Sequence, residues 1–81
     1  MRVTVKLYSL FRLKQEKYDV ARGIQVEMEE GSTILDLLHK MEINPRDVSF
    51  VRLNEEKIIK DWQKDLQEGE IIEVFPFFGG G

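Results

Sequence analysis

The stretch EGSTILDLLHKMEINP, residues 30–45, is where the hydrophobic period of the chain changes. Before it, apolar and polar residues alternate, which is typical of half-buried strands. Within it, apolar residues recur at three- and four-residue spacings and form the stripe of a helix: Ile34, Leu35, Leu37, Leu38 and Met41. Ser32 or Thr33 is expected to cap the first turn, and Asp36 is a first-turn acid. Asn44-Pro45 is expected to end the helix, because proline disfavours a helical residue before it.

Strands are predicted on both sides of this helix. Alternating residues predict one strand around Val3–Leu7 and a second at Ile24–Met28. After the helix we expect a strand at Val48–Leu53, a short one at Ile58-Ile59, and a last one at Ile71–Phe75, which Pro76 stops. The inward-facing core set is expected to be Val3, Val5, Leu7, Ile24, Val26, Met28, Leu35, Leu38, Met41, Val51, Leu53, Ile72 and Val74. The last connection is expected to cap this core with Trp62 and Leu66.

The element order is therefore strand, strand, helix, strand, short strand, strand. A hairpin, a crossing helix and a strand that returns beside the first give a mixed sheet with the helix on one face. The sequence thus predicts an α+β fold of the ubiquitin-like β-grasp type, with four to five strands and one main helix. We expect a single domain over residues 1–76 and a flexible, glycine-rich carboxyl-terminal tail over residues 77–81.

The composition excludes several functional classes. A chain of 81 residues has room for one core, and a cofactor pocket of useful volume would consume it. The balance of 15 acidic against 12 basic residues is the reverse of what a general nucleic-acid binder needs. Because there is no cysteine, disulfides, thiolate metal sites and thiol nucleophiles are excluded. No apolar run approaches a membrane span, and the start lacks a signal-peptide core, so a cytoplasmic protein is expected.

No arrangement of side chains suited to catalysis is evident. His39 is the single histidine and lies beside Lys40 on the polar side of the helix, without an acid or serine at a suitable spacing. The glycines at positions 23, 31 and 69 are isolated, and no Gly-Lys-Ser/Thr phosphate loop occurs. We therefore expect no catalytic residue, no metal site and no cofactor bound by this chain.

The end of the chain resembles a known family. Asp65–Glu70, the strand after it, Phe75-Pro76 and the final Gly80-Gly81 resemble the MoaD/ThiS-type β-grasp sulfur carriers. That family includes the small subunit of molybdopterin synthase and the thiamine-pathway carrier, and Phe75-Pro76 is more similar to the molybdopterin branch. Two features depart from the family pattern. Glu70 replaces the common Asp, and Phe77-Phe78-Gly79 replaces a small or proline-containing spacer.

The resemblance implies a carrier that is a substrate, the small non-catalytic subunit of a molybdopterin synthase-like complex. An E1-like adenylating enzyme, using ATP with Mg, would adenylate the carboxylate of Gly81. A sulfur donor protein would then supply the sulfur of a thiocarboxylate used in molybdopterin biosynthesis, for the molybdenum or tungsten cofactor. The implied partners are these two proteins and the large subunit of molybdopterin synthase. Sulfur delivery to the thiamine thiazole or another metabolite, ubiquitin-like protein modification, and a β-grasp interaction module with an inactive tail remain alternatives.

The glycine tail is suited to entering a narrow site on another protein. Gly79 and Gly80 lack a Cβ, so their backbone can pass a channel that side chains would block. Fully extended, the three glycines that end at Gly81 reach about 10 Å.

Aromatic residues near the tail are expected to form a docking patch. Tyr8 and Phe75 are predicted to share the solvent face of neighbouring strands, since Ile72 and Val74 point toward the helix. The full set expected to bind partners is Tyr8, Phe75, Pro76, Phe77 and Phe78. For Phe77, packing over the sheet edge is the alternative. A weakly basic sheet face, diluted by the acidic residues, is expected from Arg2, Lys6, Arg12 and Arg52.

Overall fold

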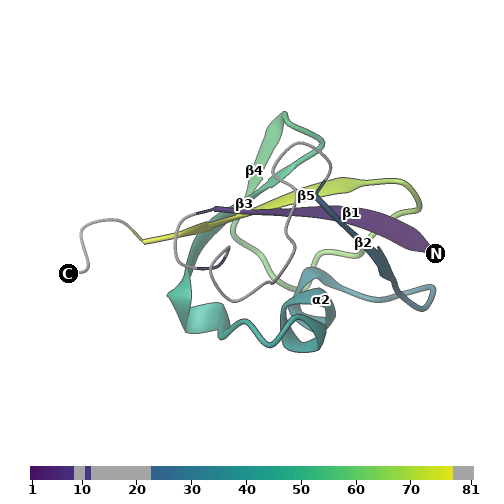
Figure 1. The fold of residues 1–81 in the computed structure, drawn as a ribbon, viewed down its shortest axis with the longest axis horizontal. Coiled ribbons are helices and arrows are strands. Elements are labelled where there is room, and N and C mark those ends of the chain that lie inside the picture. Colours follow the sequence, from purple (N-terminus) through teal and green to yellow (C-terminus); the bar gives the residue numbers. More distant parts are fainter. Residues whose placement is uncertain (9–10, 12–22, 78–81) are drawn as a thin grey trace.

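Five strands form one sheet in the computed structural model, and helix α2 packs against one face of it (Figure 1). The structure describes residues 1–8, 11 and 23–77. Along the chain the elements are β1 (Arg2–Leu7), β2 (Ile24–Glu27), α2 (Ile34–Lys40), the 3₁₀ helix η1 (Pro45–Asp47), β3 (Val48–Leu53), β4 (Lys57–Ile59) and β5 (Ile71–Pro76). The predicted order of strands and helix is confirmed.

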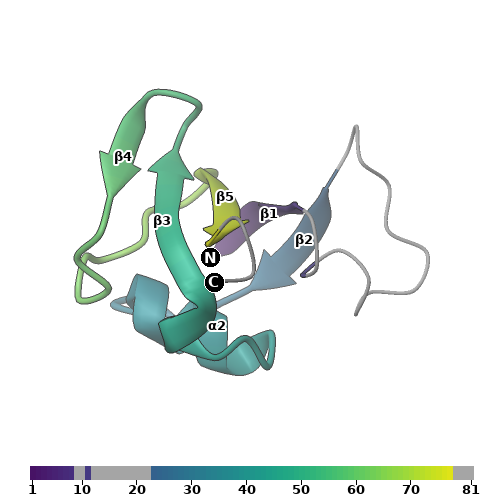
Figure 2. The ribbon, with the colours of Figure 1, turned by 90° about the vertical axis from the view of Figure 1, so that its left-hand side faces the viewer.

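Strand β5 lies in the middle of the sheet, whose order is β2-β1-β5-β3-β4. It runs parallel to β1 and antiparallel to β3, while the β1–β2 and β3–β4 pairs are antiparallel. The chain crosses from β2 to β3 by way of α2, which leaves a place for β5 between β1 and β3 (Figure 2). The described chain therefore reaches Phe77 from the central strand of the sheet and not from an edge strand.

Helix α2 begins at a capping box. The hydroxyl of Thr33 accepts a hydrogen bond from the N–H of Asp36 at 3.2 Å, and the Asp36 carboxylate accepts one from the N–H of Thr33 at 2.9 Å. Thr33 is therefore the N-cap, and Ser32 lies just outside the helix.

The helix ends in a Schellman motif, before the expected position. The N–H of Ile43 donates to the Leu38 carbonyl at 2.8 Å, and the N–H of Glu42 donates to the His39 carbonyl at 3.1 Å. Glu42 has a φ of 59°, the left-handed conformation that glycine usually supplies at this position. The helix is thus already closed before Asn44-Pro45, which instead begins η1.

The core between α2 and the sheet is apolar. Its buried members are Val3, Val5, Leu7, Phe11, Val26, Met28, Ile34, Leu37, Leu38, Ile43, Val48, Val51, Leu53, Leu66, Ile72 and Val74. The prediction for Leu35 is wrong, because its side chain is only half-buried. Helix α2 has seven residues, and the spacing of Ile34, Leu37 and Leu38 sets its inward face. Ile24 and Met41, also expected inside, are partly buried against this core.

The connection between β4 and β5 covers the start of α2. The N–H of Ile34 donates to the Lys64 carbonyl at 3.0 Å, and the N–H of Leu35 donates to the Trp62 carbonyl at 2.9 Å. A helix leaves these first-turn N–H groups without partners of its own. Leu66 is buried and Trp62 packs against the core, so the expected cap is confirmed. No helix in the described part of the chain is long and apolar enough to cross a membrane.

Candidate docking surface beside the carboxyl-terminal tail

Strand β5 leads directly into the predicted tail. It ends at Pro76, which is buried and lies opposite Val48 of β3. The next residue, Phe77, is 62% exposed, so its ring is not covered by the sheet edge. The predicted docking residue Phe78 and the predicted activation and threading positions Gly79, Gly80 and Gly81 lie outside the described residues.

Three aromatic rings are stacked on the outer face of the sheet, opposite α2. The Tyr8 and Phe75 rings are stacked with centroids 4.5 Å apart and an interplanar angle of 6°. Phe50 stacks on the other side of Phe75, with centroids 4.6 Å apart and an angle of 18°. The predicted pairing of Tyr8 with Phe75 on one face is confirmed. We call Tyr8, Phe50 and Phe75 the aromatic row.

Sequence reasoning did not place Phe50 in this row. Val48 and Val51 are both buried, although an odd spacing in a regular strand puts residues on opposite faces. The pairing of β3 with β5 shifts register between Val48 and Phe50. Such an irregularity lets Val48 face the core together with Val51. Phe50 faces outward because it alternates with the buried Val51 and Leu53, and that alternation was the signal available in the sequence.

A partly buried ion pair lies next to the aromatic row. Arg52 Nε and Nη2 donate to the two carboxylate oxygens of Glu73 at 2.6 Å and 2.9 Å, and the Tyr8 hydroxyl donates to the same carboxylate. The Arg52 guanidinium also lies over the Phe75 ring, 5.7 Å from its centroid. Glu73 points outward as expected, yet its side chain is only 2% exposed. The sequence did not predict this pairing.

The ion pair determines the ionisation of its members. The Arg52 hydrogen bonds hold the pKa of the Glu73 carboxyl below its ordinary value, against the opposing effect of burial, and the Tyr8 hydroxyl adds to the lowering. The same contact raises the pKa of Arg52. Both groups are therefore charged at neutral pH.

The expected basic sheet face is neutralised where the structure describes it. Arg2 pairs with Glu27 at 2.7 Å, Lys6 with Glu55 at 3.5 Å, and Arg52 with Glu73. Each of these three described cations therefore has an acidic partner, which weakens the positive field that they would otherwise create on this face. Arg12 lies outside the described residues.

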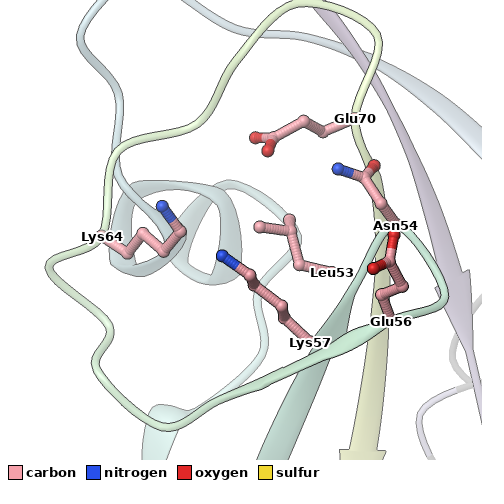
Figure 3. A pocket seen from close by; sticks show the side chains of 6 residues that line it. All are labelled: Leu53, Asn54, Glu56, Lys57, Lys64 and Glu70. Atoms are coloured by element: carbon pink, nitrogen blue, oxygen red, sulfur yellow. The ribbon is translucent and has the colours of Figure 1, made fainter.

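A separate small hollow lies at the other end of β3 and β5, between the β3–β4 turn and the connection into β5. It has a volume of about 220 Å³ and is lined by Leu53, Asn54, Glu56, Lys57, Lys64 and Glu70 (Figure 3). Two ammonium groups and two carboxylates share this hollow, so it has no net preference for an anion or a cation. The hollow and Phe75 lie at opposite ends of β5, so the hollow is also remote from the start of the tail.

No metal centre is assembled within residues 1–8, 11 and 23–77, where no group of three His, Asp or Glu side chains is placed to hold an ion. His39 is exposed on α2, on the polar side where the sequence placed it.

Helix α2 packed on one face of a five-stranded mixed sheet, with the last strand in the centre, defines a ubiquitin-like β-grasp protein. The model of the ThiS family matches residues 10–81. The chain therefore belongs to the ThiS family.

Two solved structures share this fold. SAMP1 from Haloferax volcanii superposes with a TM-score of 0.71 at 18% identity, covering 100% of each chain. A protein described as molybdopterin converting factor, subunit 1, from Pyrococcus furiosus superposes with a TM-score of 0.66 at 22% identity, covering 93% of this chain and 95% of that one. No curated protein matches the sequence. At these identities the structures establish the fold.

The family and the fold together support a ubiquitin-like sulfur carrier. Proteins of this class work in general with an E1-like enzyme and the large subunit of a synthase. Phe75, the central ring of the aromatic row, lies on β5, the strand that leads to the tail.

Proposed function

We propose that this protein carries sulfur as a thiocarboxylate on Gly81 and donates it to the synthesis of the molybdopterin dithiolene. The carboxylate of Gly81 is activated by an E1-like adenylating enzyme. The large subunit of a molybdopterin synthase-like complex then receives the charged tail. The protein itself supplies the acyl group and the docking surface, and its side chains perform no bond-making step.

The proposed activation has two steps. First, a carboxylate oxygen of Gly81 attacks the α-phosphorus of ATP, and pyrophosphate leaves. Then a sulfur nucleophile at the oxidation level of hydrosulfide attacks the acyl carbon, the bond to the AMP oxygen breaks, and a thiocarboxylate and AMP result. The chain has no cysteine, so the hydrosulfide is either free or released from the persulfide of a donor protein by a thiol reductant, which is oxidised to the disulfide. ATP and Mg bind to the adenylating enzyme.

The observation that carries the proposal is the family match, which extends through the glycine tail to residue 81. The position of β5 supports it further. This strand pairs with β1 as far as Val74 and with β3 as far as Pro76, the residue before the tail. The tail therefore begins at a fixed position, the end of β5 at Pro76. Each extended residue of the tail adds about 3.5 Å of reach from that position.

The aromatic row supports partner docking beside the tail. Phe75 and Phe50 are half-buried, and Phe77 and Ile58 are the exposed large apolar side chains of the described chain. Aromatic residues with an arginine among them are typical of interface centres. Tyr8, Phe75 and Phe77 are thus proposed to contact both partners, and Pro76 to hold the end of β5 in place.

The molybdopterin branch is proposed because of Phe75-Pro76. Sulfur delivery to the thiamine thiazole is the second candidate, favoured by the family whose model matches. The two candidates share the activation chemistry and differ in the acceptor. Co-purification with the large subunit of molybdopterin synthase or with a thiazole synthase distinguishes them.

Mass spectrometry of the intact protein tests the activation step. The chain is incubated with the adenylating enzyme of its source organism, ATP, Mg and sodium hydrosulfide. We expect a species heavier by the difference between one sulfur and one oxygen atom. Deletion of Gly81 withdraws the carboxylate by about 3.5 Å and is expected to abolish this species without changing the melting transition.

Other outcomes contradict the proposal. An unmodified mass with the active enzyme would favour the interaction module with an inactive tail. Large covalent adducts in a cell extract would favour protein modification. Full charging of the chain that lacks Gly81 would show that another group is the acceptor.

A further inference from the structure

Glu73 is an unusual residue for the outer face of a sheet. It lies on the central strand β5, two residues before Phe75, and its side chain is 2% exposed. Buried carboxylates are rare in proteins unless they are paired. This one has its hydrogen-bond partners on both neighbouring strands, Arg52 on β3 and Tyr8 directly after β1. A single carboxylate thus connects three segments at the point where the chain approaches the tail.

The contacts of Glu73 hold the two side chains that pack around Phe75. Tyr8 donates its hydroxyl to the carboxylate and stacks its ring on Phe75. Arg52 binds the carboxylate through Nε and Nη2 and lies over the same ring. Tyrosine and arginine side chains can adopt several rotamers. Hydrogen bonds to the Glu73 carboxylate restrict these rotamers before another protein docks, so less conformational entropy is lost on binding.

Folding stability alone does not explain an ion pair at this place. The Arg52 side chain is partly exposed, where ion pairs contribute little, and burying the Glu73 carboxylate costs hydration free energy. The position of Glu73 beneath the docking surface suggests a different contribution.

We propose that Glu73 is a positioning residue for partner docking: it holds Arg52 and Tyr8 so that Phe75 is presented in one arrangement to the adenylating enzyme. This rests on the proposed function. Arg52 is 38% exposed, and its Nη1 makes no hydrogen bond within residues 1–8, 11 and 23–77. The partner surface that fits is apolar opposite the aromatic row and offers an oxygen acceptor, a carbonyl or a carboxylate, to Nη1.

Binding to the adenylating enzyme of the source organism, measured by calorimetry, tests this proposal together with thermal unfolding of each variant. Glu73→Gln keeps the shape and removes the charge, and we expect affinity to fall about tenfold or more. The double variant Arg52→Met with Glu73→Leu replaces the ion pair by apolar side chains and is expected to fold at least as well as the parent. Its affinity is nevertheless expected to stay low. Glu27→Gln is the matched control, because it breaks an exposed ion pair of the same sheet, and its affinity should equal that of the parent.

The outcomes separate the two proposals. Parent-like affinity of the folded double variant would overturn the positioning role and leave the carrier function intact. Equal losses for Glu27→Gln and Glu73→Gln would overturn it too, since they would reflect net charge. Failure of the parent to bind the enzyme would count against the carrier function itself.

Discussion

Replacing Glu42 by glycine is expected to stabilise the protein by about 1 kcal/mol. Glu42 closes helix α2 with a φ of 59°, and its side chain is exposed. A residue with a Cβ pays about 1–2 kcal/mol for the left-handed conformation, and the greater freedom of glycine in the unfolded chain offsets part of the gain. The hydrogen bonds of the Schellman motif involve only the backbone, so the substitution removes none of them.

Urea unfolding followed by tryptophan fluorescence measures this effect. Trp62 is half-buried against the core and is the single tryptophan, so its emission reports the global transition. With a slope of about 1 kcal/mol per molar urea for a small domain, the midpoint should rise by about 1 M. In thermal unfolding the same change corresponds to an increase in Tm of about 4–8 °C.

Two control variants separate conformation from charge. Glu42→Ala removes the carboxylate, which is unfavourable near a helix C-terminus, but keeps the Cβ, and should stay within about 0.5 kcal/mol of the parent. Glu29→Gly makes the same change at an exposed residue whose φ is not positive, and should not stabilise. If Glu42→Gly unfolds at the same urea concentration as Glu42→Ala, the left-handed conformation carries no cost and the reasoning is refuted.

Three further predictions concern the docking surface and the tail. Because the pKa of Glu73 is lowered from an ordinary value of 4.5, its stabilising contribution is complete above that value and is lost as pH falls through the lowered pKa. As the pH is lowered from 5 into the acid range, the free energy of unfolding, measured by urea titration, should therefore fall less for Glu73→Gln than for the parent. If the free energy of unfolding falls equally with pH in both proteins, Glu73 does not titrate in that range. Phe75→Ala removes two ring stacks, each worth about 0.5–1.5 kcal/mol, so it should lower both Tm and affinity for the adenylating enzyme, the latter about thirtyfold. A lower Tm with unchanged affinity, measured by calorimetry well below Tm, would assign Phe75 a purely structural role. Gly80→Val should block ATP–pyrophosphate exchange catalysed by the adenylating enzyme, with a change in folding stability below about 0.5 kcal/mol, while Gly79→Val should be tolerated better. Equal exchange rates for both variants and the parent would mean that the tail is not threaded.

The elements of this fold could be predicted because their signals are local. The cap formed by Thr33 and Asp36 spans four residues, and the alternation of Val3, Val5 and Leu7 spans one strand. Such patterns follow from backbone geometry alone, so they can be recognised in the sequence without knowledge of what packs against them. The end of α2 could not be predicted in this way. Glu42 does not belong to the residues that usually adopt a left-handed conformation, whereas proline is a familiar signal for a helix end.

The rotation of the helix also required the tertiary structure. Leu35 and Leu37 are the same residue type and lie two positions apart. The hydrophobic pattern therefore does not indicate which of the two faces the core. The connection that includes Lys64 and Trp62 accepts hydrogen bonds from the first backbone N–H groups of the helix and so fixes how the helix is turned. The sheet therefore receives Leu37 and Ile34 instead.

By itself, the sequence determined the order of the elements, the inward face of the strands and the presence of an aromatic residue before a glycine tail. The tertiary structure alone decided that Phe50 joins Tyr8 and Phe75, and that Glu73 is buried between Arg52 and Tyr8. Those contacts join residues 65 and 21 positions apart along the chain. They depend on strand order and on the register that pairs Phe50 with Phe75 and Arg52 with Glu73, and one position of slippage would move each side chain to the opposite face. Local periodicity specifies which residues are strands, but only the assembled sheet specifies which of them are neighbours.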